Sequence, residues 1–589
     1  MTLQHTLAAS IQNIFLKFYD YKIEIDHTSI QKTKKEFEGD FTFVVFPYVK
    51  TVRKSPDLLA TEIGEKLKEQ HPDFIQGFNV IKGFLNITLQ DKVWLHPHIA
   101  RTPHTAHRIL IEYSSPNTNK PLHLGHIRNN LLGNAVANIL EACGNEVIRV
   151  NLVNDRGIHI CKSMLAWQQF GNNETPENTG IKGDHLVGKY YVLFDKELKK
   201  ELAEFASIGF SEEESLNNSR LLFNAQKMLQ KWEENNPEVR KIWTLMNGWV
   251  YDGFEETYKR LGISFDKTYY ESNTYLLGKQ IVEDNLKAGI FYQKPDGSVW
   301  IDLSDEGLDE KLLLRSDGTS VYMTQDLGTA QLRYDEYHPE KMIYVVGNEQ
   351  NYHFDVLKLI LHKKLQKKFG ENIEHLSYGM VELPFGKMKS REGTVVDADD
   401  LMEAMVQEAK ATSEALGKFD FEEKEAKELY EMLGLGALKY FILKVDPKKN
   451  MLFNPEESID FNGNTAPFIQ YTHARIKSLL RKAEANGIEY QNVSFSDHFV
   501  LEKPEKELIK LLYDSEGVLI NAAETLSPAL IANYAFELAK EFNRFYQEIP
   551  IFKEESVQFR ALRLQIAEKC AEKIKSTMKL LGIDVPERM

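Results

Sequence analysis

The chain has 589 residues, of which 42% are hydrophobic, and a formal net charge of −15 at pH 7. This composition is typical of globular proteins and excludes a disordered or collagen-like chain. No apolar run approaches the roughly 20 residues of a membrane-spanning helix, which argues against a membrane partner. The three cysteines lie far apart without a CxxC pair, so we expect neither a disulfide framework nor a structural zinc site. Because the N-terminus has no signal-peptide pattern, we expect a cytoplasmic protein. The length of the chain predicts roughly three to four domains.

Residues 1–105 are predicted to form a small α/β domain. Apolar residues at helical spacing predict a helix over 58–67, and β-rich runs predict strands at 41–49 and 84–89. The segment 96–107 is rich in Pro and His and has no periodicity, which indicates a linker.

Residues 106–404 alternate strand and helix patterns, which predicts an α/β domain with a parallel sheet and crossover helices. The clearest predicted elements are the strands 108–113, 146–153 and 342–346 and the helix 125–142. Residues 160–245 interrupt the alternation with charged helical sequence, so we interpret them as an insertion in the sheet domain.

Residues 405–589 are predicted to be helical throughout. In the last helix, apolar residues recur at a strict spacing of four, which predicts a buried stripe. The stripe consists of Leu562, Ile566, Cys570, Ile574 and Met578. We therefore expect Cys570 to pack in the core.

The segment 114–126, Ser-Ser-Pro-Asn-Thr-Asn-Lys-Pro-Leu-His-Leu-Gly-His, lies between a predicted strand and a predicted helix. Free N–H groups at a helix start bind phosphate, and Gly125 would let a nucleotide approach the backbone closely. His123 and His126, three residues apart, would lie on one face and could donate to the same phosphate group. Lys120 adds a positive charge. The segment therefore predicts a phosphate-binding turn.

A second polar segment, Phe385-Gly-Lys-Met-Lys-Ser-Arg-Glu-Gly393, is a basic loop flanked by glycines. Taken alone it is typical of a solvated surface turn. Paired with the first segment, it resembles the second of two signatures in the class I aminoacyl-tRNA synthetases, which are a His-x-Gly-His turn and a Lys-Met-Ser-Lys-Ser loop.

The chain is most similar to the arginyl-tRNA synthetase family, over nearly its whole length. The strings that carry the resemblance are SSPNTNKPLHLGH, VNDRGIHICKS, FIQYTHARIKSLLRKA, NYAFELAKEFNRFY and LLGIDVPERM. The resemblance implies a Rossmann-like catalytic domain at 106–404, a tRNA-elbow-binding domain at 1–105 and a helical anticodon-binding domain at 405–589. It also implies ATP-dependent ligation of L-arginine to tRNA(Arg) through an arginyl-adenylate, with release of AMP and pyrophosphate.

The family resemblance implies that the reaction at the phosphates of ATP is promoted by groups that bind and position ATP. It also implies that Mg²⁺ bridges phosphate oxygens. No protein nucleophile is required, because catalysis is mainly positioning and charge stabilisation. The candidate catalytic residues are Lys120, His123, Gly125, His126, Lys387 and Lys389. The candidate ATP-binding residues are His123, Gly125, His126, Gly347, Lys387 and Met388.

The second signature departs from the family pattern. It is Lys387-Met388-Lys389-Ser390, so it is either one residue short or has Lys and Ser exchanged. Arginyl enzymes often lack the second lysine of this loop, and a lysine just before the first signature is thought to replace it. Lys120 is at that position, so either Lys120 or Lys389 could contact the phosphates.

An arginine side chain is a planar fork of five donors, which carboxylates hold best. Glu271 and Asp326 are the acidic candidates, and Tyr322, four residues before Asp326, could stack on the guanidinium. The resemblance supports these three residues and adds Asn117 and Gln350 for the α-amino and carboxylate end.

The helical part contains interleaved aromatic and basic residues that suit unpaired bases. The candidates for tRNA binding are Tyr471, Arg475, Asn543 and Arg544. Packing between helices is the alternative explanation for most of the aromatic residues. The charge of −15 argues against a general nucleic-acid coat, but a local basic face can still bind one specific tRNA at physiological salt. We expect a monomer.

Three alternatives fit the sequence less well. A cysteinyl enzyme would need a zinc cluster, and a glutamyl enzyme would need basic residues where Glu271 and Asp326 stand. A non-catalytic RNA-binding relative would be expected to lose His123, Gly125 or His126. A small-molecule nucleotidyltransferase with the same turn would be shorter and would lack the helical part.

Overall fold

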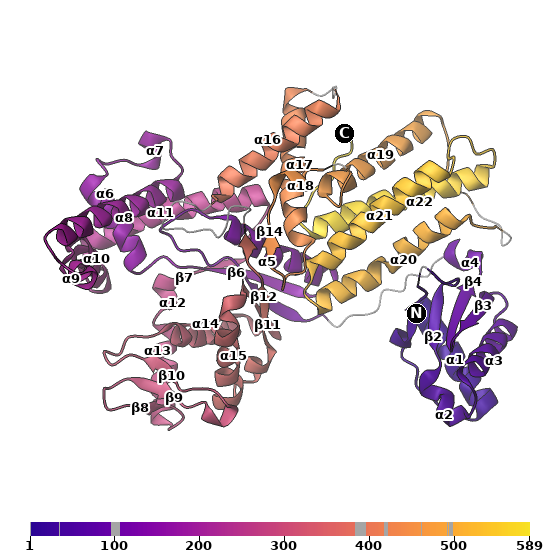
Figure 1. The fold of residues 1–589 in the computed structure, drawn as a ribbon, viewed down its shortest axis with the longest axis horizontal. Coiled ribbons are helices and arrows are strands. Elements are labelled where there is room, and N and C mark those ends of the chain that lie inside the picture. The colour runs from indigo at the N-terminus through magenta and orange to yellow at the C-terminus, as the bar shows by residue number, and fades with distance from the viewer. Residues whose placement is uncertain are drawn as a thin grey trace.

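The computed structural model describes residues 2–34, 36–95, 106–382, 396–417, 422–460, 462–491, 493 and 499–589. A small α/β unit, a central parallel sheet with helical insertions and a group of long C-terminal helices follow one another along the chain (Figure 1). The predicted fold class, α/β with a small N-terminal α/β domain and a C-terminal helical part, is confirmed. None of the helices in the described part of the chain combines the length and apolar character needed to cross a bilayer.

The N-terminal unit is an antiparallel sheet in the order β1-β2-β4-β3, covered by two helices. The strands are Ile30–Lys32, Phe41–Val44, Phe84–Leu89 and Ile75–Ile81, and the helices are α1 (Leu3–Tyr19) and α3 (Pro56–Gln70). The predicted helix over 58–67 and strand over 84–89 are confirmed. The strand predicted at 41–49 ends at Val44, because Pro47 lies in a 3-10 turn over Phe46–Tyr48.

The central sheet has five parallel strands in the order β12-β11-β5-β6-β7. They are β5 (Arg108–Glu112), β6 (Glu146–Val153), β7 (Lys267–Tyr270), β11 (Lys341–Gly347) and β12 (Ile373–Tyr378). The three predicted strands are confirmed as β5, β6 and β11. The chain adds β6 and β7 on one side of β5 and β11 and β12 on the other. In such sheets the ligand crevice lies outside the carboxyl ends of the strands where the order reverses, here at β5 and β11.

The helix α5 (Leu124–Ala142) follows β5 and packs closely on its end. A Cβ atom on Gly133 would lie 2.2 Å from the ring of Tyr113, so only glycine allows this approach. The side chain of Asn129 accepts from Ser114 N (2.6 Å) and donates to Val345 O (2.6 Å). One asparagine therefore fixes the ends of two neighbouring strands to the helix.

Two insertions interrupt the sheet. The first, between β6 and β7, is helical, and its long helices are α6 (Ile158–Phe170), α8 (Gly183–Ser207), α10 (Arg220–Glu233) and α11 (Pro237–Leu261). It lies at the left of Figure 1. The second lies between β7 and β11 and includes a small antiparallel sheet of β8 (Tyr292–Gln293), β9 (Val299–Ile301) and β10 (Lys311–Leu314). These strands have four residues or fewer, which is too short for a periodic pattern in the sequence.

Long helices dominate the C-terminal part. They are α16 (Ala398–Leu416), α17 (Glu423–Leu443), α19 (Ala466–Ala485), α20 (Lys503–Glu524), α21 (Pro528–Glu548) and α22 (Val557–Leu580). The predicted stripe of α22 is confirmed, since every member is buried and Cys570 is fully enclosed. The helices α16, α17, α20, α21 and α22 pack on α5, so the helix that begins at the first signature also supports the C-terminal part.

Candidate active site

The turn after β5 is held rigidly at the carboxyl edge of the sheet. Ser114 has a positive φ of 66°, and its hydroxyl hydrogen-bonds with Tyr258 OH (2.7 Å). Thr118 N donates to Asn154 O (3.1 Å) and Asn154 N donates to Pro116 O (2.9 Å). The turn is thus paired with the residue that follows β6, which fixes its position relative to two strands.

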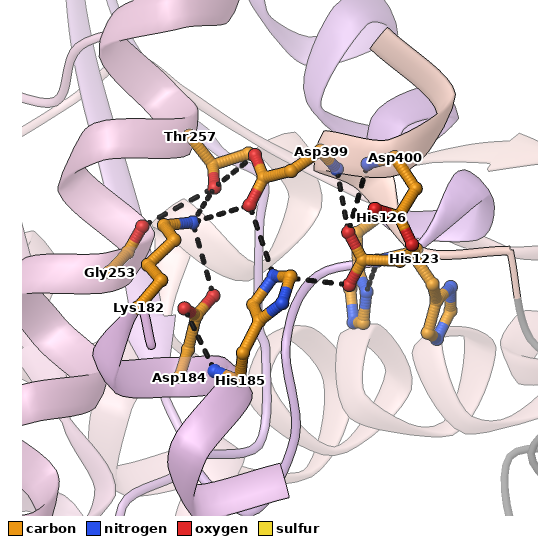
Figure 2. Close-up of polar contacts among 10 residues, drawn as sticks. His123, His126, Lys182, Asp184, His185, Gly253, Thr257, Asp399 and Asp400 are labelled. Atoms are coloured by element: carbon orange, nitrogen blue, oxygen red, sulfur yellow. Dashed lines mark hydrogen bonds and ion pairs between the residues drawn. The ribbon is translucent and has the colours of Figure 1, made fainter. Parts of the chain in front are cut away.

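His123 and His126 form a capping box at the start of α5. The Nδ1 atom of His123 accepts from Gly125 N (3.1 Å), and the Nδ1 atom of His126 accepts from His123 N (3.1 Å). A nitrogen that accepts from a backbone N–H carries no proton, so each neutral ring has its proton on Nε2. The rings lie side by side with centroids 3.9 Å apart (Figure 2). The two histidines therefore offer a pair of neighbouring Nε2–H donors.

Both histidines are neutral at pH 7. Burial, with a smaller contribution from the charge of Lys120, lowers the pKa of His123 to about 4. Burial also lowers the pKa of His126 well below its usual value. Lys120 is half-buried beside them, and burial lowers its pKa as well. The turn therefore combines neutral donors with one lysine at a helix N-terminus, which suits phosphate oxygens.

The backbone that follows the second signature lies against the first. Leu124 N donates to Val396 O (3.2 Å), and Ala398 N donates to Leu122 O (3.0 Å). The sequence places Lys387, Met388 and Lys389 shortly before Val396, but these three residues lie outside the described ones.

Two predicted acidic residues share a site at the same edge of the sheet. Glu271 begins α12 (Glu271–Thr274) directly after β7, and Asp326 lies in the second turn of α14 (Tyr322–Tyr337). Burial raises the pKa of Glu271 to about 7, and the nearby charge of Asp326 contributes to this shift. Asp326 Oδ2 lies 2.6 Å from Nε2 of His353, in α15 (Asn351–Leu359).

Four further residues predicted to bind arginine or ATP lie in the described part of the chain, beyond the carboxyl ends of strands. Tyr322 is 78% exposed and lies one helical turn before Asp326, on the same face of α14. Gly347 ends β11 and is buried, and Gln350 follows in an exposed 3-10 turn. Asn117 is exposed in the turn after β5. Topology thus brings all of them to one edge.

Three of the four residues predicted to bind tRNA meet on α19 and α21. The guanidinium of Arg475 lies 4.8 Å from the ring centroid of Tyr471 and hydrogen-bonds to Asn543. Tyr471 and Arg475 line a cavity of about 430 Å³, whose lining includes Arg481, Lys482, Tyr546, Arg588 and Met589. Arg544 is instead engaged on its own helix, where it pairs with Glu548 at 3.0 Å and Glu541 at 3.7 Å.

Comparison with known proteins identifies the family. The family model for the catalytic domain of class I (R) tRNA synthetases matches residues 90–454, the DALR anticodon-binding domain matches 469–589, and the arginyl-tRNA synthetase N-terminal domain matches 1–89. An arginine–tRNA ligase of Bacteroides thetaiotaomicron is 55% identical over the full length of both chains, and one of Phocaeicola vulgatus is 54% identical over the full length of both. The chain belongs to the arginyl-tRNA synthetase family.

Solved structures support the fold of this synthetase. Arginyl-tRNA synthetase of Thermus thermophilus superposes with a TM-score of 0.77 at 24% identity, and that of Plasmodium falciparum with a TM-score of 0.76 at 18% identity. Both comparisons cover all of each chain. At this level of identity the likeness concerns the fold alone.

Two residues of the candidate site, Asp155 and Arg156, were not predicted from the sequence. Asp155 is 1% exposed and accepts hydrogen bonds from Ser272 N (2.8 Å) and Tyr251 OH (2.9 Å), so it anchors the residue next to Glu271. The charge of Arg156 lowers the pKa of Glu271 against the larger effect of burial. Both residues lie just after the predicted strand 146–153, separated from it by Asn154, and this position at the carboxyl edge is a signal that could have identified them.

Proposed function

We propose that the chain ligates L-arginine to tRNA(Arg) at the expense of ATP, through an arginyl-adenylate, and releases AMP and pyrophosphate. The observation that carries the proposal is the pairing of two sites at one sheet edge. The capping box presents two neutral Nε2–H donors at a helix start, and the Glu271–Asp326 pair presents carboxylates. The first site suits phosphate and the second suits a guanidinium.

In this proposal the ATP site is built on the first signature. His123 and His126 donate to phosphate oxygens, Gly125 leaves room for the nucleotide, and Gly347 closes the crevice at the end of β11. Lys120 supports the same role because it lines a cavity of about 250 Å³ together with His123. Lys387, Met388 and Lys389 belong to the site by sequence.

The donor set suits ATP that carries its own Mg²⁺. The groups at the turn are N–H donors and a lysine, which bind phosphate oxygens and are no ligands for a cation. The carboxylate in the cavity lining is Asp397, and it already caps α16. Magnesium would neutralise phosphate charge when bound, with Asp397 as the protein group able to contact its water shell.

The first step joins arginine to the α-phosphorus. A carboxylate oxygen of arginine forms the new bond in line, the bond from the α-phosphorus to the bridging oxygen breaks, and pyrophosphate leaves with both electrons. His123, His126 and Lys120 stabilise the negative charge that gathers on the phosphates. Since backbone hydrogen bonds hold both histidine rings in place, the rings need not reorient as the reaction reaches its transition state.

The second step transfers the arginyl group to tRNA. The 2′-hydroxyl of the terminal adenosine attacks the carbonyl carbon, the bond to the phosphate oxygen breaks, and AMP leaves while the hydroxyl proton passes to a phosphate oxygen or to water. Class I membership supports the choice of this hydroxyl.

Arginine is selected by charge. Glu271 and Asp326 hold the guanidinium, Tyr322 stacks on it, and Asn117 and Gln350 contact the α-amino and carboxylate end. An analogue with a shorter or neutral side chain would leave a half-buried carboxylate unpaired, at a cost of several kcal/mol.

The rest of the chain would bind tRNA. Tyr471, Arg475 and Asn543 would contact anticodon bases in the cavity between α19 and α21, with Arg544 on the neighbouring face. The match of 469–589 to an anticodon-binding domain supports this part. We divide the chain into a tRNA-elbow-binding domain at 1–105, a catalytic domain at 106–404 and an anticodon-binding domain at 405–589. We further propose that the protein acts as a cytoplasmic monomer.

The decisive experiment is aminoacylation of total tRNA with each of the twenty amino acids in turn. The proposal requires charging by arginine alone, dependent on ATP and accompanied by release of AMP. Charging by another amino acid would overturn the assigned specificity, and arginine-dependent pyrophosphate exchange without charging would overturn the role in tRNA ligation.

A further inference from the structure

A polar cluster joins the helical insertion to the beginning of α16. His185 of α8 places its Nε2 atom 3.2 Å from Asp399 Oδ2 and 3.3 Å from Asp397 Oδ2 (Figure 2). Lys182, which occupies the N-cap position of α8, places its Nζ atom 2.6 Å from Asp399 Oδ2 and 3.4 Å from Asp184 Oδ2. Two side chains of the insertion, the ammonium of Lys182 and the imidazole of His185, thus contact carboxylates more than 200 residues away.

The cluster also includes α11. The Nζ atom of Lys182 donates to Thr257 Oγ1 (2.6 Å), and Thr257 Oγ1 donates to Asp399 Oδ1 (3.0 Å). Asp184 is fully buried, and a Cβ atom on Gly253 would lie 2.4 Å from its carboxylate. Both 25-residue helices of the insertion are therefore fixed to the start of α16.

Contacts within the cluster shift the pKa values of His185 and Asp399 in opposite directions, and each shift favours the charged form. The hydrogen bond to Asp399 raises the pKa of His185. Burial opposes ionisation of Asp399, but its hydrogen bonds from His185 and Lys182 outweigh burial and hold the pKa of this carboxyl well below its usual range.

From α16 the contacts continue to the first signature. Asp397 caps α16 by accepting from Asp399 N (2.8 Å) and Asp400 N (3.2 Å). The backbone on either side of it pairs with Leu122 and Leu124, and this pairing encloses His123. The path from His185 to the phosphate-binding turn thus consists of one side-chain contact and one backbone pairing.

A second contact between α8 and the turn runs parallel to the first. A Cβ atom on Gly188 would lie 2.8 Å from Pro121 Cδ, so α8 packs closely on the turn. The cavity of about 250 Å³ between them is lined by Lys120, His123, His185 and Asp397, among others. Two residues of the cluster, His185 and Asp397, therefore border the same space as the predicted phosphate ligands Lys120 and His123.

A metal ion is not required to explain the cluster. Asp184, His185 and Asp399 do offer three ligand atoms within 4.8 Å of one another, the one such group found in the described part of the chain. The ammonium of Lys182, however, already contacts Asp184, Asp399 and the Thr257 hydroxyl. The cation of this cluster is thus supplied by the protein itself.

We propose that Lys182 and His185 are positioning residues for the activation step, which through Asp397 and Asp399 hold residues 122–124 in the geometry that presents His123 and Lys120 to the phosphates of ATP. Neither side chain touches the substrate. The inference rests on the proposed function, because it assumes that phosphates bind at this turn. It assigns a catalytic contribution to the insertion that is independent of tRNA contact.

The test is arginine-dependent ATP–pyrophosphate exchange, measured with saturating tRNA(Arg) for His185→Ala and for the length-matched Lys182→Met. We expect the KM for ATP to rise ~10- to 100-fold, with or without a fall in kcat, because small displacements of positioned groups have effects of this order. The KM for arginine is expected to change less than about twofold. A role in stability alone would not separate the two substrates.

Two further variants make the test specific. Asp397→Asn keeps a side chain that caps helices well but removes the charge, so its effect should not add to that of His185→Ala. Lys199→Ala, on the exposed part of α8 where Lys199 pairs with Asp195 at 3.0 Å, is the matched control and should behave as the unmodified enzyme. If His185→Ala does not fold, as judged by thermal unfolding, His185→Gln and Lys182→Met provide the measurement.

The outcomes separate the two proposals. A KM for ATP within about twofold of the unmodified enzyme in folded His185 and Lys182 variants would overturn the positioning role, as would an equal rise in the KM values for ATP and arginine. If the unmodified enzyme shows no arginine-dependent exchange, the proposed function itself fails.

Discussion

Glu112, at the carboxyl end of β5, forms a buried ion pair with Arg333 of α14. Arg333 is 1% exposed, and its guanidinium also lies 5.0 Å from the ring centroid of Tyr269 in β7. The pair links the strand that leads into the phosphate-binding turn with the helix that carries Asp326. The two halves of the proposed active site are therefore joined beneath their surface by one pair of opposite charges.

Removing one partner of this pair should destabilise the protein. Arg333→Met leaves Glu112 buried without its countercharge, and we expect the free energy of unfolding to fall by about 3–5 kcal/mol. Adding Glu112→Gln should recover part of the loss, because the unpaired charge is then gone. Urea denaturation measures both effects. Lys427→Met, which removes the exposed partner of Glu423, is the control and should cost less than about 1 kcal/mol. A similar small effect for Arg333→Met would contradict the proposed link.

Asp326 should determine the affinity for arginine. Asp326→Asn keeps the shape but removes the charge, so we expect the KM for arginine to rise ~30-fold or more while the KM for ATP stays nearly constant, since truncating a buried charge pair costs about 2–5 kcal/mol. Steady-state pyrophosphate exchange gives both values. Asp335→Asn, on an exposed position of the same helix, is the matched control. Equal losses for both substrates would argue against this role.

The pKa of Glu271 makes arginine binding dependent on pH. Burial raises this pKa to about 7, so in the free enzyme the carboxylate becomes protonated as the pH falls below neutrality. Only the ionised form pairs with a guanidinium, and kcat/KM for arginine should therefore fall up to about tenfold per pH unit below pH 7 and level off above it. The same shift predicts that the free protein loses stability as pH rises from about 4.5 towards 7, because the folded state binds the proton more tightly than the unfolded state.

Glu271→Gln tests both statements about pH. The variant should bind arginine weakly at all pH values and lose the change in kcat/KM near pH 7. It should also unfold at a higher temperature than the unmodified protein at pH 8, because the variant lacks the buried charge that Glu271 carries at this pH. An unchanged pH profile would show that another group is responsible.

Lys120 should replace the missing second lysine of the signature loop. It lines the cavity beside His123, so Lys120→Ala should lower kcat of pyrophosphate exchange ~100-fold, as loss of one group that stabilises the transition state typically does. Lys389→Ala, measured in parallel, should have a smaller effect. A Lys120 variant with normal exchange would end the compensation hypothesis, and a larger loss from Lys389 would transfer the role to the loop.

Local patterns in the sequence predicted the parts of this fold that depend on near neighbours. The strands around 108–113 and 342–346 contain apolar runs and the stripe at Cys570 has a spacing of four, and the structure contains all three. The short strands between 292 and 314 have no such pattern, because two to four residues cannot establish a period. The His-x-Gly-His turn could be predicted because its functional groups lie within four consecutive residues.

Other parts of the site depend on contacts between distant segments. His185 and Asp399 are 214 positions apart, and nothing near either residue in the sequence indicates the other. Asp155 is a site residue only because β6 and β7 are neighbours in the sheet, which brings Ser272 to it. The Nδ1 contacts of the histidines also require backbone geometry, so the sequence predicted donors without indicating which ring nitrogen carries the proton.

The capping box determines how this protein tolerates amino-acid substitutions at His123 and His126. Active-site residues commonly reduce stability, so that their replacement strengthens the fold while it removes activity. At His123 and His126 the two demands coincide, because Nδ1 of each ring caps the start of α5 and Nε2 is the proposed donor to phosphate. A substitution there weakens the start of the helix on which the C-terminal helices rest, and it also removes a phosphate donor. Selection for a stable fold and selection for catalysis therefore act on these two positions in the same direction.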